Sequence, residues 1–210
     1  MKTKLKHPLK ILITAGPTRE YLDPVRFISN ESSGRMGFSL AQAASELGHN
    51  VVLISGPVAL DTPKNVKRLD IVSCAELRSA VHHHAPDADV IFMVAAVADA
   101  RPWQTSKHKL KKPLGHVKLR DNPDILSELG KNKKPGQVLV GFALETKKLI
   151  ETAKEKRIAK NCDWIVGNTD QAIGAKETGV VLIGPDGMTT RLPVLPKHDL
   201  AVVILSHILG

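Results

Sequence analysis

The sequence predicts an α/β fold: a doubly wound, mainly parallel sheet with helices on both faces and a C-terminal β-hairpin. Apolar, strand-like runs alternate with amphipathic helical stretches, and residues 89–96 are apolar on both faces, as in a central parallel strand. An Asp186-Gly187 turn predicts the hairpin. The expected strands are residues 10–15, 51–55, 66–72, 89–96, 137–142 and 163–167, with hairpin strands at 179–184 and 189–192. The expected helices are residues 34–48, 74–84, 123–131, 147–161 and 197–209.

The 210 residues fit a single domain, residues 1–210, that is long enough to bury a sizeable core. Hydrophobic residues make up 42% of the chain and charged residues 24%, which is atypical of disordered and of membrane proteins. The longest apolar runs fall far short of the ~20 residues that span a bilayer, and no signal-peptide cleavage pattern follows the N-terminal lysines. We therefore expect a cytoplasmic protein with no membrane partner, whose Cys74 and Cys162 are reduced.

The formal net charge of +9 indicates that the binding partners are anionic. Aromatic residues make up only 3% of the chain, which leaves few stacking platforms for nucleic acid, and the basic residues are dispersed. Small polyanions such as nucleotides are therefore the expected partners, and nucleic acid is not. Residues from about 100 to 116 combine prolines, a glycine and lysines without periodicity, which predicts an exposed, mobile flap within the domain.

The first strand leads through a long loop into a helix that opens at Ser32-Ser33-Gly34. Small residues at a helix start let unpaired backbone N–H groups, helped by the helix dipole, approach an anion closely. The same residues fit a second interpretation, in which Ser32 or Ser33 is only an N-cap and Gly34 only permits close packing. Spacing alone leaves both interpretations open.

A nicotinamide-dinucleotide site is the obvious rival for this passage, because the predicted fold is Rossmann-like. No G-x-G-x-x-G follows the first strand, and the second strand lacks the acidic residue that would hold a ribose at its end. We therefore expect the fold type without the dinucleotide site, and neither a flavin nor a nicotinamide as cofactor.

Small side chains at Ala95 and Ala96 follow the predicted central strand, where ligands of open α/β sheets bind. Asp99 could orient a ligand hydroxyl or help to hold a metal, and it could equally cap a helix or lie in a loop. The lysine-rich stretch 107–112 is solvated in the simplest interpretation. Beside a phosphate site, a mobile cationic loop could instead close over the ligand and stabilise developing charge.

Two later stretches fit both a structural and a binding role. Asn122-Pro123-Asp124 is ordinary helix-start chemistry, because Asn suits the N-cap and Pro the first helical position. Lys156 and Lys160 are four residues apart and therefore lie on one helical face. That face is compatible with binding a triphosphate and equally with a solvated surface.

Taken together, these stretches resemble bacterial phosphopantothenoylcysteine synthetase, and they recur in that family's order over nearly the whole chain. The matching segments are AGPTREYLDPVRFISNESSGRMG (15–37), SGPVAL (55–60), AAVAD (95–99), KLKK (109–112), NPDI (122–125), GFALET (141–146) and KRIAKN (156–161). The resemblance implies a ligase of coenzyme A biosynthesis that joins 4′-phosphopantothenate to L-cysteine. It implies an acyl-cytidylate intermediate made from CTP, release of pyrophosphate and then CMP, Mg²⁺ on the triphosphate, and a homodimer.

The resemblance also assigns roles to individual positions of this chain. It implies that Asn30 hydrogen-bonds the acyl carbonyl, that Arg26 belongs to the same active-site loop, and that Lys109 on the flap stabilises charge at the α-phosphate. Backbone groups of Ala95 and Ala96 would line the pocket of the intermediate. Ser33 and Gly34 are the expected contacts of the substrate phosphate. The expected nucleotide contacts are Asp99, Lys109, Asn122, Pro123, Asp124, Ile125, Phe142, Lys156 and Lys160. No protein side chain is assigned to a metal.

The chain departs from the family pattern at three points. Ala100 stands where an aromatic residue is common, Leu144 stands where a small residue is usual, and nothing here corresponds to the flavin-dependent decarboxylase fused to many relatives. We therefore expect a monofunctional, stand-alone form. Base choice does not follow from spacing, because eukaryotic relatives use ATP. A Rossmann-like NAD(P) oxidoreductase and a basic nucleic-acid-binding protein are the remaining alternatives, and the missing glycine fingerprint and low aromatic content disfavour them.

Overall fold

The computed structural model describes residues 7–111, 115–145, 147–169 and 174–210. Its centre is an eight-stranded sheet in the order β13-β12-β10-β9-β6-β1-β4-β5. The strands are β1 (Lys10–Ala15), β4 (Asn50–Ser55), β5 (Val66–Asp70), β6 (Val90–Met93), β9 (Val138–Leu144), β10 (Trp164–Asn168), β12 (Val181–Ile183) and β13 (Thr189–Arg191). All pairings from β5 to β10 are parallel, and β12 and β13 add an antiparallel edge. The mainly parallel sheet and the C-terminal hairpin are therefore confirmed.

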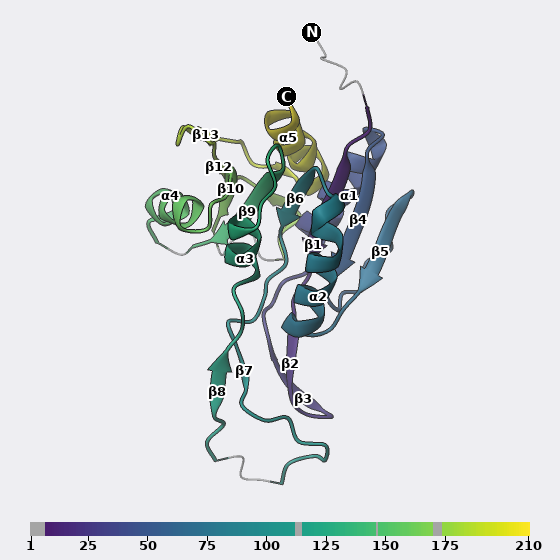
Figure 1. The fold of residues 1–210 in the computed structure, drawn as a ribbon, viewed down its shortest axis with the longest axis vertical. Helices are drawn as coiled ribbons and strands as arrows, with labels where there is room; N and C mark the ends of the chain where they lie inside the picture. Colours follow the sequence, from purple (N-terminus) through teal and green to yellow (C-terminus); the bar gives the residue numbers. More distant parts are fainter. Residues whose placement is uncertain (1–6, 112–114, 146, 170–173) are drawn as a thin grey trace.

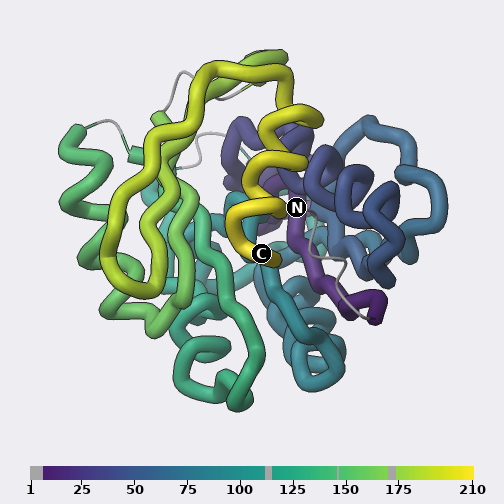
Figure 2. The backbone as a smooth tube through the Cα atoms, turned by 90° about the horizontal axis from the view of Figure 1, so that it is seen from above, coloured from purple at the N-terminus to yellow at the C-terminus, as the bar shows by residue number. Residues whose placement is uncertain are grey.

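Helices cover both faces of the sheet, as expected for a doubly wound fold (Figure 1). The helices are α1 (Arg35–Glu46), α2 (Cys74–His84), α3 (Ile125–Lys131), α4 (Leu149–Ala159) and α5 (Lys197–Leu209), with a short 3-10 turn η1 (Ala85–Asp87) after α2. Helices α1 and α5 pack side by side on one face, and α2, α3 and α4 pack on the other (Figure 2). No helix in the described ranges is long and apolar enough to cross a membrane.

Successive side chains of β1 point alternately into the two layers of the hydrophobic core. Ile11 and Ile13 pack with α1 and α5, whereas Leu12 between them packs with α2, and all three are almost fully buried. Such a strand has no polar face, because successive side chains point to opposite sides of the sheet and both sides are covered. The sequence pattern therefore determines where the sheet lies in the fold.

The prediction of a long loop after β1 is wrong, because residues 19–29 form a β-hairpin of β2 (Arg19–Asp23) and β3 (Arg26–Ser29). The turn is made by Asp23-Pro24, whose chemistry signals a turn: the Asp23 carboxylate accepts the backbone N–H groups of Val25 and Arg26 at 2.9 and 3.0 Å. The Pro-Val-Arg run after it gave no obvious strand pattern, so the hairpin was missed.

The flap region also begins and ends in strands. β7 (Ala100–Pro102) pairs antiparallel with β8 (Leu119–Asp121), and the two strands form a second hairpin. The segment that was expected to lack structure therefore begins in a strand. Both hairpins project from the same end of the molecule, and we call their described residues, 19–29, 100–111 and 115–121, together the arm (Figure 1). Residues 112–114 of the expected flap lie outside the described residues, and its mobility stays a prediction.

Close approach of α1 to the end of β1 depends on Gly37. A Cβ atom there would lie 2.6 Å from Ala15 Cβ and 3.0 Å from the Thr14 carbonyl oxygen. We predict that Gly37→Ala lowers the free energy of unfolding by about 1–3 kcal/mol through overpacking, although alanine is the better helix former. Urea unfolding measures the effect. Gln42→Ala, an exposed substitution on the same helix, should change stability by less than about 0.5 kcal/mol, and equal effects of the two would contradict the packing argument.

Candidate active site

A cavity of about 930 Å³ opens at the carboxyl ends of β1, β6 and β9. This is the edge at which open α/β sheets bind ligands. The cavity brings together residues that lie far apart in the sequence, including most of those selected from the sequence. The selected residues in its lining are Asn30, Ser33, Gly34, Ala95, Ala96, Asp99, Asn122, Pro123, Asp124, Ile125, Phe142, Lys156 and Lys160.

Two buried threonines position the backbone at the centre of the cavity. The Thr14 hydroxyl accepts the N–H groups of Val94 and Ala95 at 3.0 and 3.1 Å, and the Thr18 hydroxyl accepts that of Ala98 at 2.9 Å. The Ala96 N–H donates to the Gly16 carbonyl at 2.9 Å. These bonds end β6 earlier than expected, because the chain after Met93 pairs with hydroxyls instead of a strand. Thr14 and Thr18 are not among the residues selected from the sequence, because their role follows from the full burial of both hydroxyls, which only the structure shows.

Asn30 reaches the same loop from the end of the β2–β3 hairpin. Its side-chain Nδ2 donates to the carbonyls of Ala96 and Val97, each at 3.2 Å. The exposed amide therefore lies beside the backbone that the sequence analysis placed at the reacting group. For Asn30 to donate to an acyl carbonyl, one of these two long hydrogen bonds has to be exchanged for the ligand.

Helix α1 begins at the cavity without a side-chain cap. Its N-cap is Gly34, with φ of 75°, and no side chain bonds the first turn, so the interpretation of Ser32 or Ser33 as N-cap is wrong. Gly34 also packs closely, because a Cβ there would lie 3.1 Å from Val58 Cγ1 and 3.4 Å from Gly16 Cα. The left-handed backbone and close contact both favour glycine. The unbonded N–H groups of the first turn are free to meet an anion.

The opposite part of the cavity is organised around the start of α3. Asn122 donates to the Ala98 carbonyl at 2.8 Å and accepts from Arg101 at 2.6 Å, so its amide orientation is determined on both sides. Asp124 caps α3 by accepting the Ser127 N–H at 2.8 Å, and its second oxygen forms an ion pair with Lys160. The helix-start chemistry and the binding role suggested by the sequence therefore coexist at this point.

Lys156 lies in the same part of the cavity and donates to the Phe142 carbonyl at 2.8 Å. Burial lowers the pKa of the Lys156 ammonium from its usual value. Burial alone would raise the pKa of Asp124, but the hydrogen bonds from Lys160 and Ser127 outweigh it and lower that pKa. Lys156 and Lys160 thus bring two basic side chains to this end of the cavity, and Lys160 is paired with Asp124.

Arg26 and Lys109 do not line the cavity in this structure, although the sequence analysis placed both at the reacting groups. Arg26 instead forms an ion pair with the buried Asp23, in which Nε and Nη2 both donate to Oδ2, and it donates to the Leu110 carbonyl at 2.7 Å. The Leu110 N–H in turn donates to Asp23 at 3.0 Å. The pair therefore attaches the flap, one residue beyond Lys109, to the β2–β3 hairpin.

The Asp23 carboxylate makes this attachment sensitive to acid. Burial tends to raise its pKa, but hydrogen bonds from Arg26, Leu110 and Val25 outweigh burial and hold the pKa well below the ordinary value of 3.8. A carboxyl group with a depressed folded-state pKa stabilises the fold above its unfolded pKa, and that stability is lost as the pH falls through the folded pKa.

We therefore predict that the free energy of unfolding falls as the pH is lowered from about 4.5 to about 2, and that Asp23→Asn makes this dependence shallower. Urea unfolding at a series of pH values measures the slope. Asp61→Asn, at an exposed aspartate, is the control and should leave the slope nearly unchanged. An unaltered slope in Asp23→Asn would show that this carboxylate does not determine the acid sensitivity.

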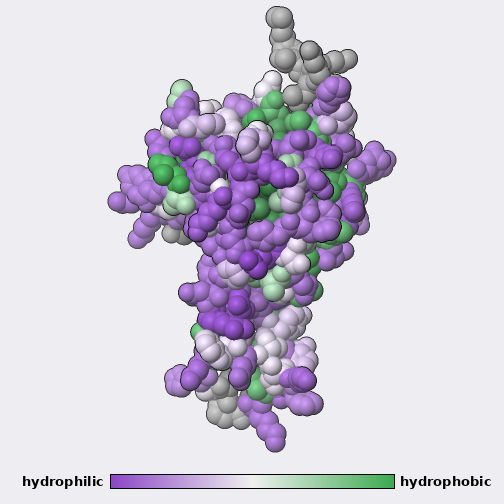
Figure 3. Space-filling view, in the orientation of Figure 1, coloured by the Kyte–Doolittle hydropathy of each residue, from purple (hydrophilic) through white to green (hydrophobic). Residues whose placement is uncertain are grey.

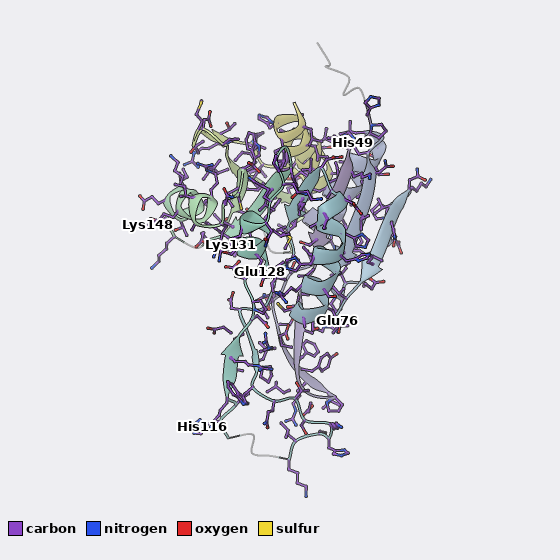
Figure 4. The ribbon with its side chains drawn as sticks, in the orientation of Figure 1. His49, Glu76, His116, Glu128, Lys131 and Lys148 are labelled. Carbon is purple, nitrogen blue, oxygen red and sulfur yellow. The ribbon has the colours of Figure 1, made fainter. Side chains whose placement is uncertain are left out.

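Outside the cavity, Glu128 on α3 joins α2 by accepting from Arg78 and His82, each at 2.8 Å (Figure 4). The two bonds fix α3 against α2 and so support the Asn122–Asp124 segment from behind. Within the described ranges, no group of three or more His, Cys, Asp or Glu side chains is arranged to hold a metal ion.

The fold and the cavity define a doubly wound α/β protein with a large cavity, lined in part by basic side chains, at the carboxyl edge of its sheet. The chain belongs to the family described as the DNA/pantothenate metabolism flavoprotein C-terminal domain, whose sequence profile matches residues 7–210.

Comparisons with a curated relative and with solved structures agree with this family. The chain is 45% identical over 205 residues to Coenzyme A biosynthesis bifunctional protein CoaBC of Bacillus subtilis (strain 168), covering 94% of this chain and 50% of that protein. It thus spans about half the length of the curated relatives it matches. A crystal structure of the C-terminal domain of CoaBC is 39% identical, with a TM-score of 0.85, covering 99% of this chain and 96% of that one. A Cab2 mutant in complex with phosphopantothenate-cysteine is 20% identical with a TM-score of 0.80, covering 96% of this chain and 85% of that one, and shares the fold.

Proposed function

We propose that this chain joins 4′-phosphopantothenate to L-cysteine through an amide bond, at the expense of CTP. The observation that carries the proposal is the cavity, which gathers the uncapped start of α1, the amide of Asn30 and the cations Lys156 and Lys160 in one space. The relatives' role in coenzyme A biosynthesis and the phosphopantothenate-cysteine bound to the Cab2 fold support the choice of substrates. A cytoplasmic location is part of the proposal.

The first step activates the acid. A carboxylate oxygen of 4′-phosphopantothenate attacks the α-phosphorus of CTP, the bond to the β-phosphate oxygen breaks, and pyrophosphate leaves. The enzyme contributes by holding the two anions together and by neutralising charge that develops on the phosphates. Lys156 and Lys160 supply cations for the nucleotide phosphates, and Lys109 joins them when the flap closes.

The second step forms the amide. The neutral amine of cysteine attacks the acyl carbon, CMP leaves from it, and the amine loses a proton. Negative charge develops on the acyl oxygen in the transition state, so a donor aimed at this oxygen accelerates the step. Asn30 fits this role, because its Nδ2 already lies against the carbonyls of Ala96 and Val97 and can exchange one of them for the acyl oxygen.

Mg²⁺ fits this site as an ion carried by the nucleotide. Mg²⁺ prefers oxygen ligands and usually binds through one or two carboxylates together with substrate phosphates. Asp99 is an exposed carboxylate in the lining, whereas Asp124 is engaged by Lys160 and the α3 cap. Asp99 would therefore hold the ion beside the phosphates, and the bound ion would neutralise their charge.

The activity is tested by incubating the protein with 4′-phosphopantothenate, cysteine, Mg²⁺ and CTP. We expect pyrophosphate and CMP in equal amounts, together with the amide. Formation of CDP, or of no nucleotide product, would contradict an acyl-cytidylate. Replacing CTP by ATP tests base choice, and we expect the higher kcat/KM with CTP.

We predict that Asn30→Ala and Lys109→Ala each lower turnover by ~10²-fold or more, because each removes a donor to charge in a transition state. Single-turnover measurements should assign the Lys109 effect to CMP transfer and the Asn30 effect to amide formation. Lys107→Ala removes the same charge from the flap and should retain turnover within ~3-fold. Normal turnover in either of the first two variants would remove that residue from the mechanism.

The arm is the surface on which we propose that a second copy of this chain binds. It presents an unusual number of large apolar side chains to solvent, and Figure 3 shows apolar (green) groups among the hydrophilic ones along it. The exposed apolar residues of the arm are Val25, Phe27, Trp103, Leu110, Val117 and Leu119. Several exposed apolar side chains gathered on one projecting element favour an interface there.

For the homodimer, we predict that light scattering gives twice the chain mass and that Trp103→Asp shifts the equilibrium toward monomer by at least ~10-fold in Kd. Loss of a large buried aromatic from an interface and burial of a charge both oppose association. Ile158→Asp, at an exposed apolar position on α4, is the control and should leave the mass unchanged. A monomeric wild-type chain at micromolar concentration would contradict the dimer.

A further inference from the structure

Arg101 is a half-buried basic residue at the base of the arm, and the proposed reaction steps do not use it. It is the central residue of the three-residue strand β7, and its cross-strand partner in β8 is Arg120. Arg101 lies outside the lining of the cavity, but its Nη1 donates to the Oδ1 atom of Asn122 at 2.6 Å. Asn122 itself does line the cavity. Arg101 therefore influences the cavity through another side chain.

Asn122 is held against the end of the loop after β6 by three hydrogen bonds. Its backbone N–H donates to the Asp99 carbonyl at 2.8 Å, which continues the antiparallel β7–β8 pairing toward the cavity. Its Nδ2 donates to the Ala98 carbonyl at 2.8 Å, and its Oδ1 accepts from Arg101. The N–H of Ala98 is in turn bonded to the buried Thr18 hydroxyl. The carbonyl that Asn122 contacts is thus already fixed by the network that shapes the centre of the cavity.

The chemistry of the two side-chain partners determines which way the Asn122 amide points. A guanidinium can only donate and a backbone carbonyl can only accept, so the amide oxygen has to face Arg101 and the amide nitrogen has to face Ala98. Rotation of the amide by a half-turn would place its N–H groups against the guanidinium and its oxygen against the carbonyl. Both contacts would then be repulsive, whereas without Arg101 only the Ala98 contact opposes the rotation.

The fixed orientation determines what the amide can offer to a ligand. Its Nδ2 atom carries two N–H groups, and the Ala98 carbonyl uses one of them. The second N–H has no partner among the described residues, at a position that lines the cavity beside Asp99 and Asp124. Ionised carboxylates can only accept, so the amide adds a neutral donor to this part of the lining. A nucleotide carries matching acceptors on its phosphates, its ribose and its base.

The Arg101 guanidinium also lies near the start of α2. Burial, followed by the charge of Glu20, raises the pKa of the Cys74 thiol to about 11, and the positive charge of Arg101 opposes this rise. Arg101 is therefore placed at the junction of the arm with α2, outside the space that a ligand occupies. A guanidinium suits this place because its planar fork is pre-organised, so little rotamer freedom is lost for each hydrogen bond formed.

We propose that Arg101 is a positioning residue of the nucleotide site, which holds the Asn122 amide so that its second N–H donates to an acceptor of the bound CTP. The inference rests on the proposed function, in which Asn122 contacts CTP. Arg101 contributes by opposing rotation of a donor and makes no contact with the nucleotide. The effect belongs to nucleotide binding, and binding of 4′-phosphopantothenate does not depend on it.

The kinetic test compares kcat/KM for CTP and for 4′-phosphopantothenate, each with the other substrates saturating. Arg101→Met removes the donor but keeps an unbranched side chain. We expect it to lower kcat/KM for CTP by at least ~10-fold and that for 4′-phosphopantothenate by less than ~3-fold. Arg120→Met removes the same charge from the exposed cross-strand partner and should stay within ~3-fold of wild type for both substrates. Equal losses for both substrates in Arg101→Met would contradict a role confined to the nucleotide.

A double-mutant cycle separates positioning of Asn122 from general support of the arm. Asn122→Ala removes the amide, so the further change Arg101→Met has nothing left to position. We expect the double variant to match Asn122→Ala in kcat/KM for CTP within ~3-fold. A further loss of ~10-fold in the double variant would overturn the proposal, because Arg101 would then act independently of Asn122.

Calorimetric titration with CTP and Mg²⁺, without the acid and cysteine, separates this inference from the proposed function. We expect the Kd for CTP to rise by at least ~10-fold in Arg101→Met and to stay within ~3-fold of wild type in Arg120→Met. An unchanged Kd in Arg101→Met, in a chain that forms the amide normally, would refute the positioning role and leave the reaction standing. A wild-type chain that binds CTP with this dependence on Arg101 but forms no amide would refute the reaction and leave the positioning role standing.

Discussion

The hydrogen bonds of two buried threonine hydroxyls, Thr14 and Thr18, are the interactions on which the cavity depends. Together with backbone hydrogen bonds between Ala96 and residues 16 and 18, they hold the loop after β6 against the loop after β1, beyond the end of the regular strand pairing. Buried N–H groups that lose their partners cost free energy, so this loop has little freedom to adopt another path. The position of Ala95 and Ala96, and hence the centre of the cavity, follows from this pairing.

The arm begins directly after Thr18, where the β2–β3 hairpin starts. Directly after Thr18, the Arg19 N–H donates to the Val72 carbonyl at 2.8 Å, and the buried Glu20 carboxylate accepts the Cys74 N–H at 2.8 Å. The hairpin is thereby fixed to the start of α2, whose own first turn is capped by Ser73 and Glu76 (Figure 4). The rigid end of the sheet thus continues into the arm, while the flap is attached to it through Asp23.

The sequence predicts the sheet well because its strands are apolar on both faces, and residues 10–15, 74–84 and 197–209 coincide with elements of the structure. It fails where side-chain chemistry determines the backbone, as at Asp23 in the unexpected hairpin. The cavity residues could be selected by resemblance, since the motifs are local. The hydrogen bonds that join Arg26 and Asp23 to Leu110 could not, because they depend on how the hairpin and the flap come together.

The order of the strands also governs how the molecule meets other copies of itself. The sheet ends at β5 on one side, which carries the charged side chains of Lys67, Arg68 and Asp70, and at the three-residue β13 on the other. Charged or very short edge strands oppose the addition of a further strand. Open-ended growth of the sheet from chain to chain is therefore disfavoured, so that the proposed dimer would form through side-chain surfaces, where association can close symmetrically and stop.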